Sequence, residues 1–249
     1  MLSLLLGLSR LIAFIIFVSF FSVIFYFMSF FWSKETNSSK ALQLRDFLIR
    51  GLNIILGIRT TIYGQKPTTQ GLIIANHRSY FDPLVIVNLI HAFPVGKKEV
   101  ASWPLIGYIC KISGVIFVDR KCSKSRQETA ESIREVLAKG YSIINFPEGT
   151  THDLPTTVDF NYGSFVMATK IKSAVIPIAI DYKEKTDAFI GDDTFVPHFL
   201  KSFGKRTTDI KITFFPPIYS EDASYLLDTS KDLIDKELIR YRKDWESEN

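Results

Sequence analysis

The most uneven part of the hydrophobic pattern lies near the N-terminus, where residues 11–32 form a run of 22 positions without a charged side chain. Eight of the 21 phenylalanines fall in this run. As an α-helix it would be about 33 Å long, close to the roughly 30 Å hydrocarbon thickness of a bilayer. It is longer than the roughly 7–15 residues of a signal-peptide core, and no small-residue cleavage site follows it. We therefore expect residues 1–35 to form a transmembrane anchor.

Basic residues flank this run unevenly. Arg10 alone precedes it, and several basic residues follow it: Lys34, Lys40, Arg45 and Arg50. Because Lys and Arg are enriched on the cytoplasmic side of membrane helices, we expect a single-pass anchor with the C-terminal bulk of the chain on the cytoplasmic face. A glycosylation sequon at residues 37–39 would matter only on the opposite side, and we interpret it as a chance occurrence.

Residues 36–58 show a second pattern, in which apolar positions recur at helical spacing. The apolar positions are Leu44, Phe47, Leu48, Leu52, Ile55 and Leu56. The polar positions among them are Arg45, Asp46, Arg50 and Asn53. We assign this segment as an amphipathic interfacial helix, and the alternative of a helix packed on the globular core stays open.

Beyond residue 58, short β-rich runs alternate with segments of helical periodicity. Strands are predicted at residues 59–63, 72–76, 115–118, 142–146, 175–181 and 210–215. Helices are predicted at residues 82–91, 103–112, 125–138, 163–172 and 221–245. This alternation is typical of an α/β fold. We expect one domain, residues 59–249, with a mixed, mostly parallel sheet flanked by helices.

Composition and charge narrow the class of protein. Hydrophobic residues make up 47% of the 249-residue chain and charged residues 22%, which excludes a disordered chain. The net charge of +4 suits an anionic membrane surface or a phosphate-bearing ligand, but it is too small to indicate nucleic acid binding. The two cysteines, Cys110 and Cys122, provide neither a disulfide framework nor a metal site. The sequence contains no P-loop, G-x-G-x-x-G, G-x-S-x-G, H-E-x-x-H or C-x-x-C motif.

Candidate chemistry begins where the apolar run at residues 72–75 ends. His77 follows this predicted strand, and Asp82 comes five residues later at a predicted helix start. A carboxylate beside one imidazole nitrogen fixes the tautomer and raises the basicity of the other nitrogen. Such a pair needs no nucleophile of its own if the substrate carries a hydroxyl. The alternative is an ordinary helix start, because Asp82 followed by Pro83 is a good N-terminal pair.

Two further groups of polar residues follow predicted strands. Arg120 ends the run at residues 114–120, where a guanidinium can hold a phosphate through two hydrogen bonds. Glu148, Gly149 and Thr150 follow Pro147 after another strand and place a carboxylate, backbone N–H groups and a hydroxyl together. The plain interpretation of the first group is a surface ion pair, and that of the second is a turn. Their repeated position at strand ends favours a shared site.

These motifs resemble the glycerolipid acyltransferases, the family typified by lysophosphatidic acid acyltransferase. His77 and Asp82 match the H-x4-D motif of that family. Residues 97–120, 146–150 and 175–178 are similar to its second, third and fourth blocks, in the same order.

The resemblance implies that His77 is the general base and Asp82 its orienting partner. The residues it implies for binding the acyl acceptor are Arg120, Glu148, Gly149 and Thr150, with Pro177 supporting the site. The implied reaction transfers a fatty acyl group from acyl-CoA or acyl carrier protein to 1-acyl-glycerol-3-phosphate, giving phosphatidic acid. No metal or other cofactor is implied. The expected partners are the lipid bilayer, a lysophospholipid acceptor and the thioester donor.

Two positions depart from the family pattern. Thr151 stands where many members have Arg, and Asn161 stands where many have Lys. Both changes remove positive charge that is expected near a phosphate, so another acceptor, such as a lyso-ornithine lipid, stays open. Two further functions also stay open: thioester hydrolysis by the same pair, and lipid binding by a catalytically silent protein.

Overall fold

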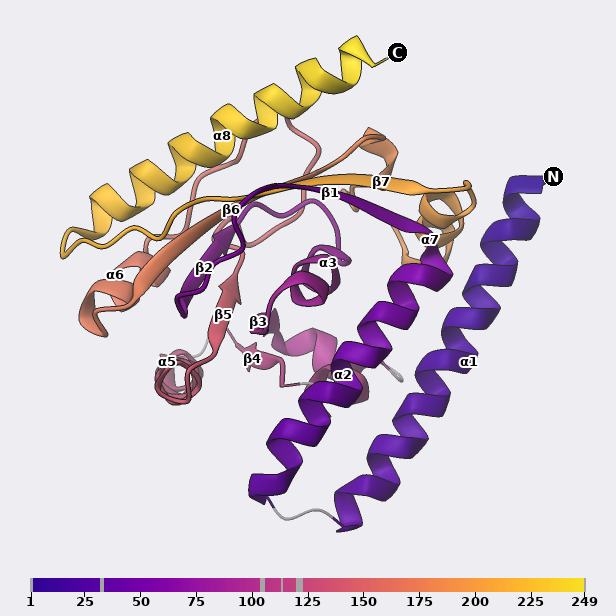
Figure 1. Cartoon of the computed structure of the whole chain (residues 1–249), viewed down its shortest axis with the longest axis horizontal. Helices are drawn as coiled ribbons and strands as arrows, with labels where there is room; N and C mark the ends of the chain where they lie inside the picture. The colour runs from indigo at the N-terminus through magenta and orange to yellow at the C-terminus, as the bar shows by residue number, and fades with distance from the viewer. Residues whose placement is uncertain (1, 32–33, 104–105, 113, 120–122, 249) are drawn as a thin grey trace.

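The computed structural model describes residues 2–31, 34–103, 106–112, 114–119 and 123–248 (Figure 1). The strands are β1 (Ile58–Gly64), β2 (Gly71–Ala75), β3 (Ala92–Lys97), β4 (Ile116–Val118), β5 (Ser142–Asn145), β6 (Ala174–Tyr182) and β7 (Thr208–Phe214). The helices are α1 (Leu2–Phe31), α2 (Lys34–Leu56), α3 (Asp82–Leu89), α4 (Ile106–Ile112), α5 (Ser123–Ala138), α6 (Gly163–Lys170), α7 (Phe195–Phe203) and α8 (Ala223–Ser247). Two 3₁₀ turns are η1 (Lys98–Ser102) and η2 (Lys185–Asp187).

The strands form one mixed sheet in the order β1-β7-β6-β2-β5-β3-β4. From β6 to β4 all neighbours run parallel, whereas β7 is antiparallel to β6 and parallel to β1. This confirms the predicted α/β domain with a mixed, mostly parallel sheet. Because β6, β2 and β5 are parallel neighbours, their carboxyl ends meet at one edge of the sheet, where ligands bind in such folds.

Helices cover both faces of this sheet, as Figure 1 shows. Side chains alternate along β2, so that Ile73 packs toward α3 while Leu72 and Ile74 pack toward α6 and α8. All three are fully buried. Burial on both faces explains why β2 is a continuous apolar run and not an alternating one.

A third apolar cluster joins α1 and α2 to α7. Phe14, Phe21 and Phe25 of α1 are buried against a partner surface that includes Leu52 and Phe199. The opposite face of α1 carries exposed apolar side chains, namely Ile12, Ile15, Ile16, Phe20, Val23, Tyr26 and Phe27. The segment Leu2–Met28 is long and apolar enough to cross a membrane, by length and composition.

The N-terminal part of α1 is held against the same domain. Arg10 donates to the carbonyl oxygens of Phe203, Lys205 and Arg206, at distances of 2.6–2.9 Å, just beyond the end of α7. Gly7 passes so close to α7 that an added Cβ would lie 2.9 Å from the Leu200 carbonyl oxygen. One face of α1 is therefore docked on protein, and only the other face is available to lipid.

The α2 helix spans the segment that we assigned to the membrane interface. Leu48, Ile49 and Leu52 are buried against α1 and the sheet domain, as in the packed alternative. Phe47 and Ile54 are exposed on the other side. The inner face therefore packs on protein, while an interfacial location of the outer face stays a prediction, as does the division at residues 35 and 58.

Two elements escaped the sequence prediction. β3 contains Pro94, and proline is unusual inside a strand. The pairing of β3 with β4 begins only at Val95, so Pro94 precedes that pairing. The predicted helix 82–91 accordingly ends at Leu89, and β3 begins at Ala92.

α7 starts with Pro197 in its first turn and packs its aromatic side chains against α1, a contact that local sequence does not reveal. Of the predicted helix 103–112, the described helical part is α4, which begins at Ile106, and η1 precedes it in the chain.

Candidate active site

The residues of the first motif meet at the carboxyl end of β2. His77 lies two residues beyond the strand, and Asp82 is the first residue of α3. His77 Nδ1 is 2.7 Å from Asp82 Oδ2. The Asp82 side chain is fully buried, whereas 20% of the His77 side chain is exposed. The structure thus places a buried carboxylate behind a partly accessible imidazole.

Three further donors point at the Asp82 carboxylate. Its Oδ2 accepts the backbone N–H groups of Arg78, at 2.6 Å, and Ser79, at 2.9 Å. Its Oδ1 accepts the hydroxyl of Tyr182 at 2.8 Å. An ionised carboxylate accepts all of these bonds and has no proton to donate. The proton between the two side chains therefore belongs to Nδ1 of His77, and in the neutral imidazole the lone pair is on Nε2.

Tyr182 was not predicted as a site residue. It ends β6, which lies next to β2, so its hydroxyl reaches Asp82 across 100 positions of sequence. Burial, and then the neighbouring Asp82 charge, raise the pKa of Tyr182 well above its ordinary value. The hydroxyl therefore stays neutral and acts as a donor. The available signal was its place at the end of a predicted strand, as for the recognised motifs.

The other nitrogen of His77, Nε2, belongs to the partly exposed imidazole and points away from Asp82. The imidazole stacks on Phe146, which follows β5, with ring centroids 4.2 Å apart and an interplanar angle of 21°. Within the described ranges, Nε2 has no hydrogen-bond partner. Stacking on Phe146 and the bond to Asp82 together hold the ring so that the free lone pair is directed away from both.

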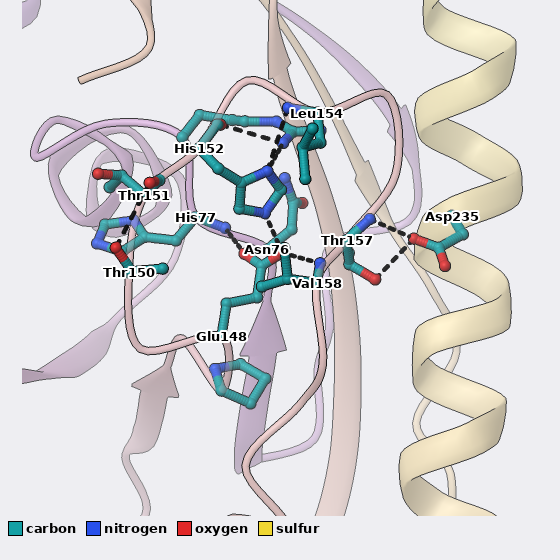
Figure 2. Close-up of polar contacts among 12 residues, drawn as sticks. Asn76, His77, Glu148, Thr150, Thr151, His152, Leu154, Thr157, Val158 and Asp235 are labelled. Carbon is teal, nitrogen blue, oxygen red and sulfur yellow. Dashed lines mark hydrogen bonds and ion pairs between the residues drawn. The ribbon is translucent and has the colours of Figure 1, made fainter. Parts of the chain in front are cut away.

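Glu148 binds the chain around His77. Its Oε2 accepts the backbone N–H of His77 at 2.5 Å, and its Oε1 accepts Nε2 of His152 at 2.6 Å and the backbone N–H of Val158 at 3.1 Å (Figure 2). Its side chain is completely buried. Both oxygens are thus engaged by donors of this chain, and the expected contact of Glu148 with the acceptor stays a prediction.

The turn that carries Glu148 also positions Gly149 and Thr150. The N–H of Gly149 donates to the Phe146 carbonyl oxygen at 3.1 Å, which closes the turn. Gly149 has φ of +73°, a conformation that favours glycine. Thr150 is exposed, and the N–H of His152 donates to the His77 carbonyl oxygen at 3.4 Å, so the loop runs beside His77. Thr150 is therefore accessible near the imidazole, as an acceptor-binding residue requires.

A buried chain of charges lies behind His152, and no local sequence pattern predicts it. Arg78 donates to His152 and lies 3.4 Å from Asp181, which in turn forms a 2.6 Å ion pair with Arg242 of α8. Burial raises the pKa of Asp181, and the charges of the two arginines oppose that shift. Because His152 Nδ1 also accepts from the Leu154 N–H at 3.2 Å, its proton is on Nε2, toward Glu148.

One predicted residue, Pro177, does not make polar contacts with this group, and another, Arg120, is not among the described residues. Pro177 lies within β6, paired with Ile74, three residues before His77 in the neighbouring strand, and it is buried in the sheet. The predicted support of the site by Pro177 stays a prediction. Arg120 lies outside the described residues, beyond the end of β4, so its predicted role in phosphate binding stays a prediction.

No group of three or more His, Cys, Asp or Glu side chains is arranged to hold a metal ion in the part of the chain that the structure describes. The expectation that no cofactor is needed stays a prediction. The fold and the site define an α/β protein in which a partly exposed histidine is paired with a buried aspartate at the carboxyl edge of the sheet. This arrangement suits proton removal from a substrate hydroxyl.

Comparison with known proteins assigns the family. A sequence model of the Acyltransferase family matches residues 58–181. A lyso-ornithine lipid O-acyltransferase of Pseudomonas aeruginosa is 30% identical over 184 residues, 72% of this chain and 71% of the relative. The chain belongs to the acyltransferase family.

Other relatives are more distant. A lyso-ornithine lipid O-acyltransferase of Rhizobium meliloti is 27% identical over 180 residues, and the match spans 65% of this chain and 62% of that relative. A human 1-acyl-sn-glycerol-3-phosphate acyltransferase alpha is 25% identical over 153 residues, 59% of this chain and 53% of the relative. The matches therefore leave a substantial part of these relatives uncovered.

The fold also has a solved counterpart. The crystal structure of the 1-acyl-sn-glycerophosphate acyltransferase PlsC from Thermotoga maritima superposes with a TM-score of 0.73, covering 96% of each chain at 18% sequence identity. At this identity the similarity establishes the fold, including the two N-terminal helices, and leaves the substrate open.

Proposed function

We propose that this protein is an O-acyltransferase that transfers a fatty acyl group from a thioester to the free hydroxyl of a lysolipid. One observation carries the proposal: four donors converge on the buried Asp82, so that Nδ1 of His77 is a donor and the neutral imidazole has its lone pair on Nε2. Membership of the acyltransferase family supports the reaction class.

The proposed reaction needs one proton to move through His77. Nε2 removes the hydroxyl proton while the lysolipid oxygen attacks the thioester carbonyl carbon. The ionised Asp82 stabilises the imidazolium that forms, because its charge lies 2.7 Å from Nδ1. When the C–S bond breaks, the proton passes from Nε2 to the leaving thiolate. The ester, the thiol and the neutral histidine are then the products.

The identity of the acyl acceptor depends on the residues near His77. We favour a lyso-ornithine lipid, because two relatives with broad coverage are named for that acceptor and because Thr151 and Asn161 bring no positive charge to the site. The side chains of both residues are engaged within the chain, Thr151 with the Phe189 carbonyl and Asn161 with the Pro147 carbonyl. The second candidate is 1-acyl-glycerol-3-phosphate, supported by relatives named for that acceptor.

We also propose that the protein works at a membrane surface. The support is the exposed apolar face of α1, which lies opposite the face docked on α2 and α7. Crossing the bilayer as an isolated span would require α1 to leave the contacts that Gly7 and Arg10 make with the α7 region. A cytoplasmic location of the catalytic domain, from the distribution of basic residues around α1, belongs to this proposal.

The test is acyl transfer by the full chain in phospholipid vesicles, with a long-chain acyl-CoA or acyl carrier protein thioester and each lysolipid in turn. Mass spectrometry identifies the products. We expect ornithine lipid to form faster than phosphatidic acid and His77→Ala to lower either rate at least about 10³-fold. Fatty acid release that added lysolipid does not diminish would instead show a hydrolase. If no turnover depends on His77, the protein is a catalytically silent lipid-binding protein.

A further inference from the structure

The loop that carries Glu148 is long and has an anchor outside the family-matched region. Residues 146–162 connect β5 to α6 without a helix or strand, a span of 17 positions. Loops of this length have many conformations unless other parts of the protein hold them. The structure holds this one near its middle, at Thr157, through α8. The family match ends at residue 181, so α8 lies beyond it.

Thr157 makes hydrogen bonds through three of its groups. Its N–H and its hydroxyl both reach Asp235 Oδ1, at 2.7 Å each (Figure 2). Its carbonyl oxygen accepts from Lys231 Nζ at 3.2 Å, and the same ammonium group lies 2.7 Å from the hydroxyl. Lys231 and Asp235 are one helical turn apart and form a 3.0 Å ion pair. Together these bonds determine both the position and the orientation of Thr157.

The next residue connects this anchor to the site. The N–H of Val158 donates to Glu148 Oε1, and Oε2 of the same carboxylate accepts the N–H of His77. Figure 2 shows the sequence of contacts from Asp235 through Thr157 and Val158 to Glu148 and His77. Val158 is one of two donors to Oε1, the other being His152, so loss of the anchor weakens the hold on the Glu148 carboxylate that positions the backbone of His77.

A second ion pair on α8 has the same chemistry without these contacts. Asp232 and Lys236 are also one turn apart, at 2.7 Å, and both side chains are more than half exposed. Among the described residues, their hydrogen bond is to each other and not to the loop. The chain therefore contains its own matched comparison, a pair that anchors the loop and a pair that lies in solvent.

We propose that Asp235, assisted by Lys231, is a positioning residue for acyl transfer. It acts on His77 through Thr157, Val158 and Glu148, and it touches no substrate. This proposal rests on the proposed function, because it assigns Asp235 to the same site. A residue with this role is expected to affect turnover more than donor binding, since it changes the alignment of the base and leaves the donor's contacts intact.

The first test compares Asp235→Ala with Asp232→Ala in the full chain in vesicles. We expect Asp235→Ala to lower kcat about 10- to 100-fold, with the KM for the thioester donor changed less than about twofold. Asp232→Ala is expected to retain both constants. Thermal unfolding is followed in parallel, and rates are measured well below the midpoint of each variant, so that loss of folded protein does not imitate loss of turnover.

The second test removes the contact from the loop side, in case Asp235→Ala does not fold. Thr157→Val loses the hydroxyl, whereas Thr157→Ser keeps it. We expect the valine variant to lose several-fold in kcat and the serine variant to recover most of it. Combining Asp235→Ala with Thr157→Val is expected to cost less than the product of the two separate effects, because both remove the same interaction. Asp232→Ala with Thr157→Val is expected to be multiplicative.

These outcomes separate the two proposals. Equal kcat values for Asp235→Ala and Asp232→Ala, or an equal loss in the valine and serine variants, would overturn the role of Asp235. A loss in Asp235→Ala that follows only the fraction of folded protein would overturn it as well. If the unmodified protein transfers no acyl group, or if His77→Ala retains activity, the proposed function fails whatever Asp235 does.

Discussion

The two longest helices of the described chain, α1 and α8, both bury one apolar face and differ in the other. On α1 the outer face is a continuous set of large apolar side chains that includes Ile12, Ile16 and Phe20. On α8 the outer face carries an exposed ion pair at helical spacing, Asp232 with Lys236. Packing on the domain selects the inner faces, whereas the outer faces differ in polarity: the outer face of α1 suits lipid and that of α8 suits water.

The helices also differ in how they are attached. α1 contacts the domain mainly through aromatic packing, with Phe14 and Phe199 rings 5.5 Å apart, and through the carbonyl contacts of Arg10. α8 adds directed polar contacts to its apolar face: Asp235 binds Thr157, and Arg242 binds Asp181. Directed contacts determine orientation where apolar packing mainly supplies stability, so we expect the α8 side to control the site's geometry more closely.

The largest effects are expected on the buried faces, where the loss of a side chain should lower the free energy of unfolding similarly for α1 and α8. Phe199→Ala and Leu238→Ala remove fully buried side chains from the α1 and α8 contacts. We expect each to lower the free energy of unfolding by about 3–5 kcal/mol, through lost burial and a remaining cavity. Urea unfolding measures this, with the exposed Lys201→Ala on α7 as the control. A cost below about 1 kcal/mol for Phe199→Ala would show that α1 is not docked on α7.

A pH effect is expected on the α7 side. Burial raises the pKa of Asp187 to about 6, although Lys205, paired at 2.5 Å, opposes the shift. A raised folded-state pKa contributes stability below the unfolded value, near 4, and loses it as pH rises through about 6. We expect the unmodified protein to lose on the order of 3 kcal/mol over this window relative to Asp187→Asn.

The measurement is the unfolding free energy of both proteins at several pH values between 4 and 7. Asp232→Asn on the exposed part of α8 is the matched control, and its curve should run parallel to that of the unmodified protein. Parallel curves for Asp187→Asn as well would contradict the assignment, because they would mean that ionisation of Asp187 costs nothing in the fold.

The outer faces are expected to separate the helices. Ile16 on α1 is 63% exposed and Ile239 on α8 is 41% exposed. Ile16→Asp puts a charge into lipid, at a cost of about 2 kcal/mol, so we expect roughly 30-fold weaker binding to phospholipid vesicles. Ile239→Asp should bind as the unmodified protein does. Sedimentation with vesicles measures both, and equal weakening of the two variants would remove the distinction between the faces.

The smallest effect is expected at the exposed ion pairs of α8. Asp232→Ala breaks a pair whose members are 55% and 73% exposed. Solvent screens such pairs, and we expect the free energy of unfolding to change by no more than about 0.5 kcal/mol. Urea unfolding is again the measurement. A change of about 2 kcal/mol, well beyond the range for exposed pairs, would show that the water-facing side of α8 is itself part of a contact.

The parts that sequence predicted are those with local causes. Periodicity located six of the seven strands that the described residues form, because a strand is a short run rich in apolar and β-branched residues with turn residues around it. His77 and Asp82 were found because the five-residue spacing across a strand-to-helix connection brings them together without help from the rest of the chain. β3 was missed because Pro94 contradicts the usual strand pattern. Proline is tolerated at this position because the pairing with the short β4 begins at the next residue, Val95.

The parts that escaped prediction depend on distant segments. Tyr182 reaches Asp82 because β6 lies beside β2 in the sheet. Asp235 reaches Thr157 because α8 packs across one face of the sheet. His152 was overlooked although its partner Glu148 is four residues away in the same loop, and its other partner, Arg78, comes from the loop after β2. Their residue types are ordinary, so no local pattern distinguishes them.

By itself the sequence therefore determined the fold class, the apolar N-terminal helix and the identity of the histidine–aspartate pair. These features follow from short-range periodicity and spacing, which the chain carries in every conformation. Tertiary structure alone decided which nitrogen of His77 is open, which residues hold Asp82 and Glu148, and which face of α1 is left for lipid. Those properties arise from the burial and hydrogen bonding of groups far apart in the chain, which exist only when the sheet and its helices have assembled.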